Sequence, residues 1–175
     1  MDESERRLAF EVIGEADIPE LTRVMTRAFD HDTQIHLGEE RGGPDGYDNG
    51  DFLRNWLFGY EESEGHKVVC DEQTIGAVIV WILPRGHNVL GTVFVDPEFQ
   101  SQGIGTQIWC HVEARYPGTR SWRLETPDLA TRNHYFYEAK CGFQRVETDP
   151  VVGASDGMVI YRKDMGPEDS EPPLP

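Results

Sequence analysis

The pattern of apolar and polar residues along the chain predicts an irregular alternation of strands and helices. Short apolar or alternating runs are typical of strands, whereas apolar residues spaced by three and four indicate a helix. These patterns predict strands at residues 8–13, 66–70, 74–83, 88–95, 121–126, 143–148 and 157–163. They predict helices at about residues 17–30, 51–60, 104–116 and 133–140. The order of elements indicates an α/β domain.

The length of the chain favours one domain with a short tail. At 175 residues the chain is long enough to bury a core without metals or disulfides. We expect residues 1–165 to form a single domain. Residues 166–175 are acidic and rich in proline, and we expect this tail to be disordered.

The first helix has a recognisable start. Asp17 and Glu20 have the spacing of a capping box, and Pro19 lies in the first turn between them. This pattern predicts that the helix begins next to Asp17.

A glycine-rich turn joins the strand at residues 88–95 to the next helix. The turn has the pattern Gln100-x-x-Gly103-x-Gly105. Two closely spaced glycines allow the backbone to approach an anion, and the positive end of the helix dipole adds to the attraction. We therefore interpret the segment as a phosphate-binding loop, although a plain tight turn would use the same glycines. The patterns of nucleotide triphosphatases and of dinucleotide-binding folds are absent, which leaves coenzyme A as the better ligand.

This loop resembles the pyrophosphate-binding loop of the GNAT superfamily of acyl-CoA-dependent N-acetyltransferases. The resemblance extends over nearly the whole order of elements and implies a mixed, mostly antiparallel sheet flanked by helices on both faces. It implies that the strand before the loop carries a bulge and parts from the next strand, so that the backbone of Phe94 and Val95 pairs with the pantetheine arm of acetyl-CoA. It places the diphosphate on the residues of the loop, which are Gln100, Ser101, Gln102, Gly103, Ile104, Gly105 and Thr106.

A second segment, residues 133–143, resembles the C-terminal motif of the same superfamily. The resemblance implies that Asn133 lies along the pantetheine arm and that Tyr137 donates a proton to the departing thiolate. Tyr137 lies five residues before the motif glycine rather than the usual four. One extra residue, near Ala139, either lengthens the turn or rotates the helix, and in the second case Tyr135 replaces Tyr137.

The predicted reaction needs a general acid, and it can also use a general base. A hydroxyl within reach of the sulfur stabilises the thiolate as it forms. The alternative for the aromatic residues 135–137 is packing alone. For the base, Glu125 on the strand at residues 121–126 is one candidate, and His31 with Asp32 is another. The simpler interpretation, which we favour, is a strand-end surface charge for Glu125 and a solvated loop residue for His31.

The connection between the first two helices is the expected acceptor region. Residues 30–51 contain seven acids and one arginine, which suggests a cationic amine acceptor, although the whole chain is acidic. The glycines and proline of residues 42–46 fix particular turns and would present Tyr47 and Asp48. We therefore name Tyr47, Asp48, His31 and Asp32 as candidate substrate-binding residues.

The charge of the chain argues against one class of partner and suggests a habitat. There are 32 acidic and 16 basic residues, a net charge of −16, and the lysines are Lys67, Lys140 and Lys163. Nucleic acid is an improbable partner for such a surface. An acidic, lysine-poor chain suits concentrated salt, which screens self-repulsion, so we expect a halophilic source. Equal stability with and without molar salt would contradict this hypothesis.

The cysteines and the N-terminus indicate a reduced, cytoplasmic protein. Cys70, Cys110 and Cys141 form no Cys-x-x-Cys pair, which argues against a disulfide framework or a zinc site. We expect three reduced thiols in or near the core and no metal. Neither a signal peptide nor a membrane-spanning stretch is present, so we expect no membrane partner.

Together these features predict an enzyme that transfers the acetyl group of acetyl-CoA directly to an amine, without a covalent acyl-enzyme. The acceptor stays open among polyamines, antibiotics, amino acids, and the N-terminus or lysines of a protein. One alternative is a non-catalytic acyl-CoA-binding regulatory module, and another is a structural interaction protein with a vestigial loop. A homodimer is plausible by analogy only.

Overall fold

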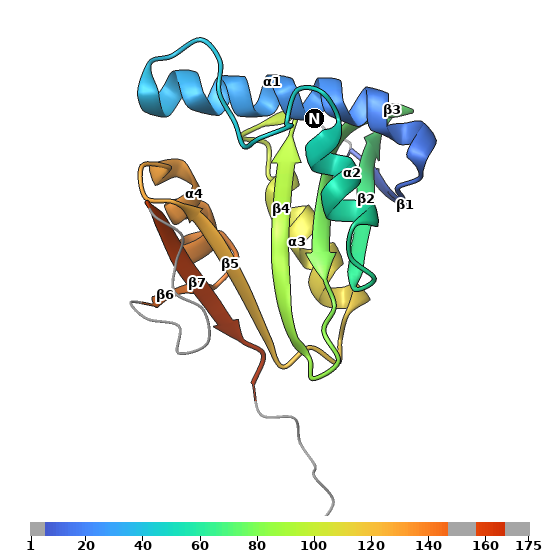
Figure 1. Cartoon of the computed structure of the whole chain (residues 1–175). Helices are drawn as coiled ribbons and strands as arrows, with labels where there is room; N and C mark the ends of the chain where they lie inside the picture. Colours follow the sequence, from blue (N-terminus) through green and yellow to red (C-terminus); the bar gives the residue numbers. More distant parts are fainter. Residues whose placement is uncertain (1–5, 147–156, 167–175) are drawn as a thin grey trace, which may run out of the picture.

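A single mixed sheet organises the chain in this computed structural model, which describes residues 6–146 and 157–166. Its strands lie in the order β1-β2-β3-β4-β5-β7-β6 (Figure 1). Their bounds are β1 Leu8–Val12, β2 Ser63–Cys70, β3 Gln73–Trp81, β4 His87–Val95, β5 Ser121–Pro127, β6 Gln144–Val146 and β7 Met158–Asp164. Neighbours pair antiparallel except for β4 and β5, which are parallel. The predicted mixed, mostly antiparallel sheet is therefore confirmed.

Helices cover both faces of the sheet. They are α1 Ile18–Leu37, α2 Asp51–Phe58, α3 Ile104–Arg115 and α4 Thr131–Tyr135. Short 3₁₀ turns lie at Glu15–Asp17 and Pro97–Phe99, and α4 continues directly into a π-helical turn at Phe136–Lys140. Helices α1 and α2 pack on one face, whereas α3 and the π turn pack on the other.

Helix α1 is longer than its sequence predicts. It was expected to end near residue 30, but it continues to Leu37. Gly38 then adopts a φ of 69° and its N–H donates to the Gln34 carbonyl, which is a common way for a helix to end. His31 and Asp32 therefore lie on a helix, and the prediction of a loop at these two residues was wrong.

The start of α1 is predicted correctly, but the capping box does not form. The Asp17 carboxylate accepts hydrogen bonds from the Gly14 N–H and from Lys67 Nζ, both at 2.8 Å. The Glu20 carboxylate accepts a hydrogen bond from the Thr74 hydroxyl at 3.2 Å. These two acids therefore attach the start of α1 to strands β2 and β3 instead of capping the helix.

The sheet divides between β4 and β5. Only three residue pairs join the two strands, from His87 with Ser121 to Val89 with Arg123. One extra residue in β4, Gly91, shifts its register against β3 at this point. Beyond the junction the two strands diverge toward α1 and α4 (Figure 1). The bulge and the parting that the superfamily resemblance implied are therefore both present.

Two hydrophobic cores lie on the two faces of the sheet. The core under α3 includes Ile108 and Trp109 of the helix, Val80 of β3 and Trp122 of β5, so it spans the division of the sheet. The core under α1 and α2 contains residues of those helices, of β3 and of β4, and no buried residue of β5. The two halves of the molecule are therefore held together mainly on the α3 face.

Some predictions at the edges need correction or lie outside the described residues. Cys70 and Cys141 are buried as predicted, but Cys110 is exposed on α3, so that prediction was wrong. Residues 147–148 of the predicted strand 143–148 lie outside the described residues. Residues 167–175 of the tail also lie outside them, so the tail and the single domain at residues 1–165 stay predictions. No described helix is long and apolar enough to cross a membrane.

Candidate active site

A cavity of about 780 Å³ is lined by the part of β4 that no longer pairs with β5. Its walls come from α1, from the end of β4, from the glycine-rich turn with the start of α3, and from α4 with the π turn. Segments far apart in the sequence therefore meet around one space. The volume lies within the roughly 300–1,000 Å³ range of small-molecule sites.

The glycine-rich turn presents the start of α3 to this cavity. Gly103 has a φ of 78° and stands at the cap position of α3 without any side chain to cap the first N–H groups. Ser101 also has a positive φ, of 60°. Backbone N–H groups left open at a helix start suit an anion, so these residues fit a phosphate group.

Gly105 allows close packing between the turn and the opposite wall of the cavity. A Cβ atom at Gly105 would lie 3.0 Å from ring atoms of Phe136. The second motif glycine therefore maintains a contact with the π turn.

The two glutamines of the turn have different places. Gln100 lines the cavity, and its Nε2 donates to the Val95 carbonyl at 2.9 Å. Gln102 does not line it. Its Nε2 donates to the Glu98 carbonyl at 3.0 Å, and its Oε1 accepts a hydrogen bond from Arg6. The other predicted turn residues, which are Ser101, Gly103, Ile104, Gly105 and Thr106, all line the cavity.

An ion pair fixes the turn to α1. The Asp96 carboxylate is almost fully buried, accepts hydrogen bonds from Arg27 Nε at 3.1 Å and Nη2 at 2.5 Å, and accepts another from the Glu98 N–H at 3.1 Å. One buried side chain therefore joins the helix above the cavity to the turn below it. The sequence contained no local signal for this pair, because its members lie 69 positions apart.

The predicted pantetheine residues line the cavity from two sides. Phe94 and Val95 line it from β4, where the Phe94 side chain packs into the core under α1 and α2. The Val95 carbonyl already accepts the hydrogen bond from Gln100. Asn133 lines the cavity from α4, and its Nδ2 donates to the Thr126 hydroxyl at 3.1 Å.

The π turn places Tyr137 inward. The Cys141 N–H donates to the Phe136 carbonyl at 3.1 Å, a five-residue span that absorbs one extra residue within the turn. Tyr137 is buried and lines the cavity, and burial raises the pKa of its phenol strongly. Tyr135 also lines the cavity but is 63% exposed. Of the two tyrosines, Tyr137 is therefore the protonated phenol enclosed by protein.

Glu125 is not brought to the cavity. It lies on β5, is not among the lining residues, and accepts a hydrogen bond from Arg123 at 3.0 Å. Glu125 is therefore held in an ion pair, and its role as a general base stays a prediction.

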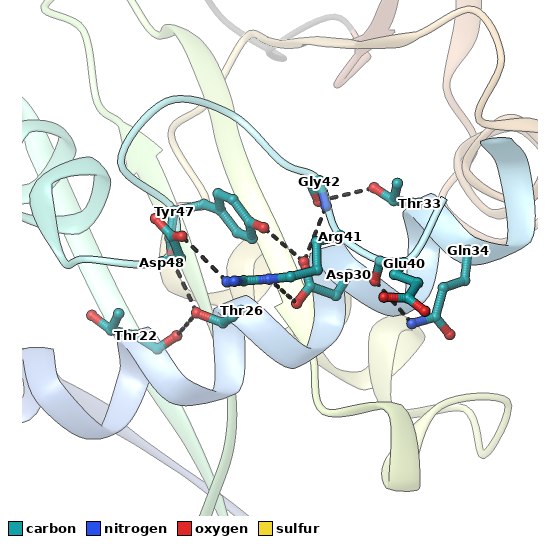
Figure 2. A network of polar contacts seen from close by, with 10 residues as sticks. All are labelled: Thr22, Thr26, Asp30, Thr33, Gln34, Glu40, Arg41, Gly42, Tyr47 and Asp48. Atoms are coloured by element: carbon teal, nitrogen blue, oxygen red, sulfur yellow. Dashed lines mark hydrogen bonds and ion pairs between the residues drawn. The ribbon is translucent and has the colours of Figure 1, made fainter. Parts of the chain in front are cut away.

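The connection between α1 and α2 is held by a polar network (Figure 2). The Tyr47 hydroxyl donates to Asp30 Oδ1 at 2.7 Å, and the Gly42 N–H donates to the same oxygen at 3.1 Å. This bond to Asp30 raises the pKa of the Tyr47 phenol. Arg41 bridges Asp30 at 3.5 Å and Asp48 at 3.3 Å. Tyr47 and Asp48 therefore fold the connection onto α1, and neither lines the cavity.

The two candidate substrate-binding residues on α1, His31 and Asp32, differ in whether they reach the cavity. Asp32 lines the cavity, whereas the adjacent His31 does not.

The lining also includes residues that the sequence did not suggest, among them Phe29, Arg132 and Lys140. Arg132 and Lys140 lie inside or beside the second motif, so their basic character next to a predicted phosphate site was an available signal. Among the described residues, no group of three His, Cys, Asp or Glu side chains is arranged to hold a metal.

Comparison with known proteins agrees with this architecture. The family model described as "Acetyltransferase (GNAT) domain" matches residues 62–145. The uncharacterised protein YrkN of Bacillus subtilis is 34% identical over 145 residues, which is 82% of this chain and 77% of that protein. The chain belongs to the GNAT superfamily.

Solved structures show the same fold. An acetyltransferase from Thermus thermophilus has a TM-score of 0.70 at 16% identity, covering 90% of this chain and 97% of that one. The PaiA N-acetyltransferase of Thermoplasma acidophilum, solved with coenzyme A, also has a TM-score of 0.70 at 16% identity, covering 90% of this chain and 99% of that one.

Proposed function

We propose that the protein transfers the acetyl group of acetyl-CoA directly to an amine. The observation that carries this proposal is the cavity itself, which has an uncapped helix start at one side and a buried, protonated phenol, Tyr137, on another wall. Membership of the GNAT superfamily supports acetyltransferase chemistry in general. Bound acetyl-CoA would supply an activated acetyl thioester.

The residues around the cavity divide the work. Gly103, Gly105 and their neighbours in the turn would bind the diphosphate through backbone N–H groups. Asn133 and the backbone of Phe94 would orient the pantetheine arm between the parted strands.

Tyr137 would hold a proton until a thiolate forms beside it. Because burial raises the pKa of this phenol, it stays protonated over the whole physiological range. A phenol in a dry site stabilises an adjacent anion well, since little water competes with its hydrogen bond. Tyr135 is too exposed to share that advantage.

The experiment that tests this proposal is a calorimetric titration of the protein with acetyl-CoA in molar salt. We expect micromolar binding that is lost when Gly103 and Gly105 are both replaced by valine, because Gly103 needs a positive φ and a side chain at Gly105 would press on the Phe136 ring. Gly118→Ala is the matched control, since a Cβ there meets no atom within 4 Å. Absence of binding by the folded wild type would reject the proposal.

Release of thiol in the presence of amines completes the test. Turnover with any amine supports the enzyme, whereas tight binding without turnover across a broad panel indicates an acyl-CoA-binding module instead. We place the enzyme in the cytoplasm of a salt-adapted cell, as a monomer or a homodimer. Sedimentation in molar salt distinguishes these two states.

A further inference from the structure

The charge of the cavity lining is the reverse of the charge of the chain. The chain has 32 acidic and 16 basic residues, but the described residues around the cavity include one acid, Asp32, and two bases, Arg132 and Lys140. Asp32 belongs to α1, and the two bases belong to α4 and the π turn. The C-terminal end of α1 lies over α4 (Figure 1). The cavity therefore has one negative wall and one positive wall.

Asp32 differs from the other acids near it. Asp30 and Asp48 are both engaged by Arg41, and Asp30 also accepts hydrogen bonds from Tyr47 and Gly42. No described residue donates a hydrogen bond to Asp32. His36 Nε2 lies 3.7 Å from Asp32 Oδ1, which is beyond hydrogen-bond distance and makes an ion pair only when the histidine is protonated.

The surroundings of Asp32 strengthen its attraction for a cation. Its side chain is 34% exposed, so part of its hydration is already lost. An ionic attraction is stronger where protein replaces water, because the effective dielectric constant is lower. A carboxylate that accepts no hydrogen bond from the described residues gains more from a cationic ligand in such a place than a fully exposed surface acid does.

Asp32 and the proposed acid Tyr137 line the same cavity. The charge of Asp32 contributes to the raised pKa of Tyr137, after burial and Cys141. Electrostatic influence falls with distance, so this contribution agrees with the presence of both side chains around one cavity. A group held by Asp32 would therefore lie within the length of a small molecule from the phenol.

We propose that Asp32 selects an acceptor that carries a second positive charge, so that the substrate class is a linear diamine or polyamine. This inference rests on the proposed acetyl transfer at the same site. Asp32 holds the distal ammonium group while the other amine faces the thioester. An acceptor with a carboxylate at the distal end would meet the Asp32 charge and be rejected.

Three amines of equal chain length test this inference. Cadaverine, pentylamine and delta-aminovalerate each carry a primary amine on a chain of five carbons, and the fifth carbon bears an ammonium group, is a methyl group or is a carboxylate. We expect the wild type to acetylate cadaverine with the highest kcat/KM and delta-aminovalerate with the lowest. Asp32→Asn should lower kcat/KM for cadaverine about tenfold, the effect of one charge-assisted hydrogen bond, with little change for pentylamine.

Glu39→Gln is the matched control, because Glu39 is an exposed acid just after the end of α1 and does not line the cavity. It removes the same charge from the chain, and its kcat/KM values should equal those of the wild type. Equal loss of activity toward all three amines in Asp32→Asn, or no preference among them in the wild type, would overturn the selection by Asp32 while the acetyltransferase proposal stands.

A binding measurement separates the two proposals. Cadaverine is titrated calorimetrically into the wild type and Asp32→Asn, each saturated with coenzyme A. Cadaverine binding that depends on Asp32 without any turnover would support the site and reject the enzyme. Turnover that does not depend on Asp32 would support the enzyme and reject selection by Asp32.

Discussion

The two halves of the sheet are built differently. Strands β1 to β4 pair along their lengths and carry a core on each face, whereas β5, β7 and β6 form an arm joined to β4 by three residue pairs. The arm shares the core under α3 but contributes no buried residue to the core under α1 and α2. Packing on one face thus keeps the arm attached, while the interrupted pairing leaves space for a ligand. The core under α3 stabilises the junction between β4 and β5, whereas the candidate site lies where the pairing of these strands has ended.

The largest effect should come from breaking the shared core. Trp122→Ala removes a fully buried indole that packs edge-on against Trp109 at 5.6 Å between ring centres. We expect a loss of about 3–5 kcal/mol in the free energy of unfolding, measured in urea. Leu53→Ala, in the other core, should cost about 2–5 kcal/mol.

These two variants test whether the halves unfold together. Because the α3 core spans the division, both should show one cooperative transition. A separate early transition in Trp122→Ala alone would mean that the arm is an independent unit.

The next effect concerns the wall of the cavity formed by α4 and the π turn, which connect β5 to β6. Tyr137→Phe should lower kcat by about 100-fold or more, the usual contribution of a general acid, with the Kd for acetyl-CoA unchanged. Tyr135→Phe should leave kcat close to the wild type, because that phenol is exposed. A normal kcat in Tyr137→Phe would transfer the role of acid to another group.

A smaller effect is expected where α1 is joined to the glycine-rich turn. Arg27→Met leaves the buried Asp96 carboxylate without its charged partner, which should cost about 1–3 kcal/mol of unfolding free energy. The affinity for acetyl-CoA should fall as well, because Asp96 also holds the Glu98 N–H beside the turn. Arg23→Met, an exposed position on the same helix, is the control. Unchanged affinity would show that the turn holds its shape without α1.

The smallest expected effect is a dependence of stability on pH that comes from two histidines, His66 of β2 and His111 of α3. Burial lowers the pKa of His66, as does the nearby Arg115, against a small opposing effect of Glu64. Burial, with His66 and Arg115, likewise lowers the pKa of His111. The unfolded chain therefore binds more protons, and the free energy of unfolding falls as the pH drops below about 6.5.

His111→Phe should reduce this dependence and keep the stacking on Phe10, whose ring centre lies 3.8 Å from that of His111. Urea unfolding at several pH values between neutrality and mild acid measures it. A pH profile identical to that of the wild type would exclude His111 as a contributor.

The sequence predicted correctly the elements whose conformation depends on neighbouring residues. The glycine-rich turn and the start of α3 could be predicted from Gly103 and Gly105, because these glycines and the residues next to them determine the local backbone conformation. The π turn was foreseen only as one of two alternatives. Whether an extra residue near Ala139 widens a turn or rotates a helix depends on what the helix packs against, and here Tyr137 packs between Phe143 and Tyr161.

The second half of α1 was missed for a different reason. Residues 31–37 are largely polar, so they show no apolar face, and this part of the helix extends beyond the core over the cavity. Gly38 was an available stop signal that would have given the correct end. The network of Asp30 and Arg41 depends on how the connection folds back, which no pattern in the sequence specifies.

The placement of the lysines makes the protein a convenient target for chemical labelling. Lys67 Nζ is held by Asp17 and Glu11, and Lys163 Nζ by Glu113 and the Cys141 carbonyl. Lys140 is exposed and lines the cavity, with its Nζ 5.9 Å from the centre of the Tyr135 ring. Among the lysine side chains, an amine-reactive dye should therefore attach first at the mouth of the cavity, and the extent of its attachment would report directly on whether that mouth is covered.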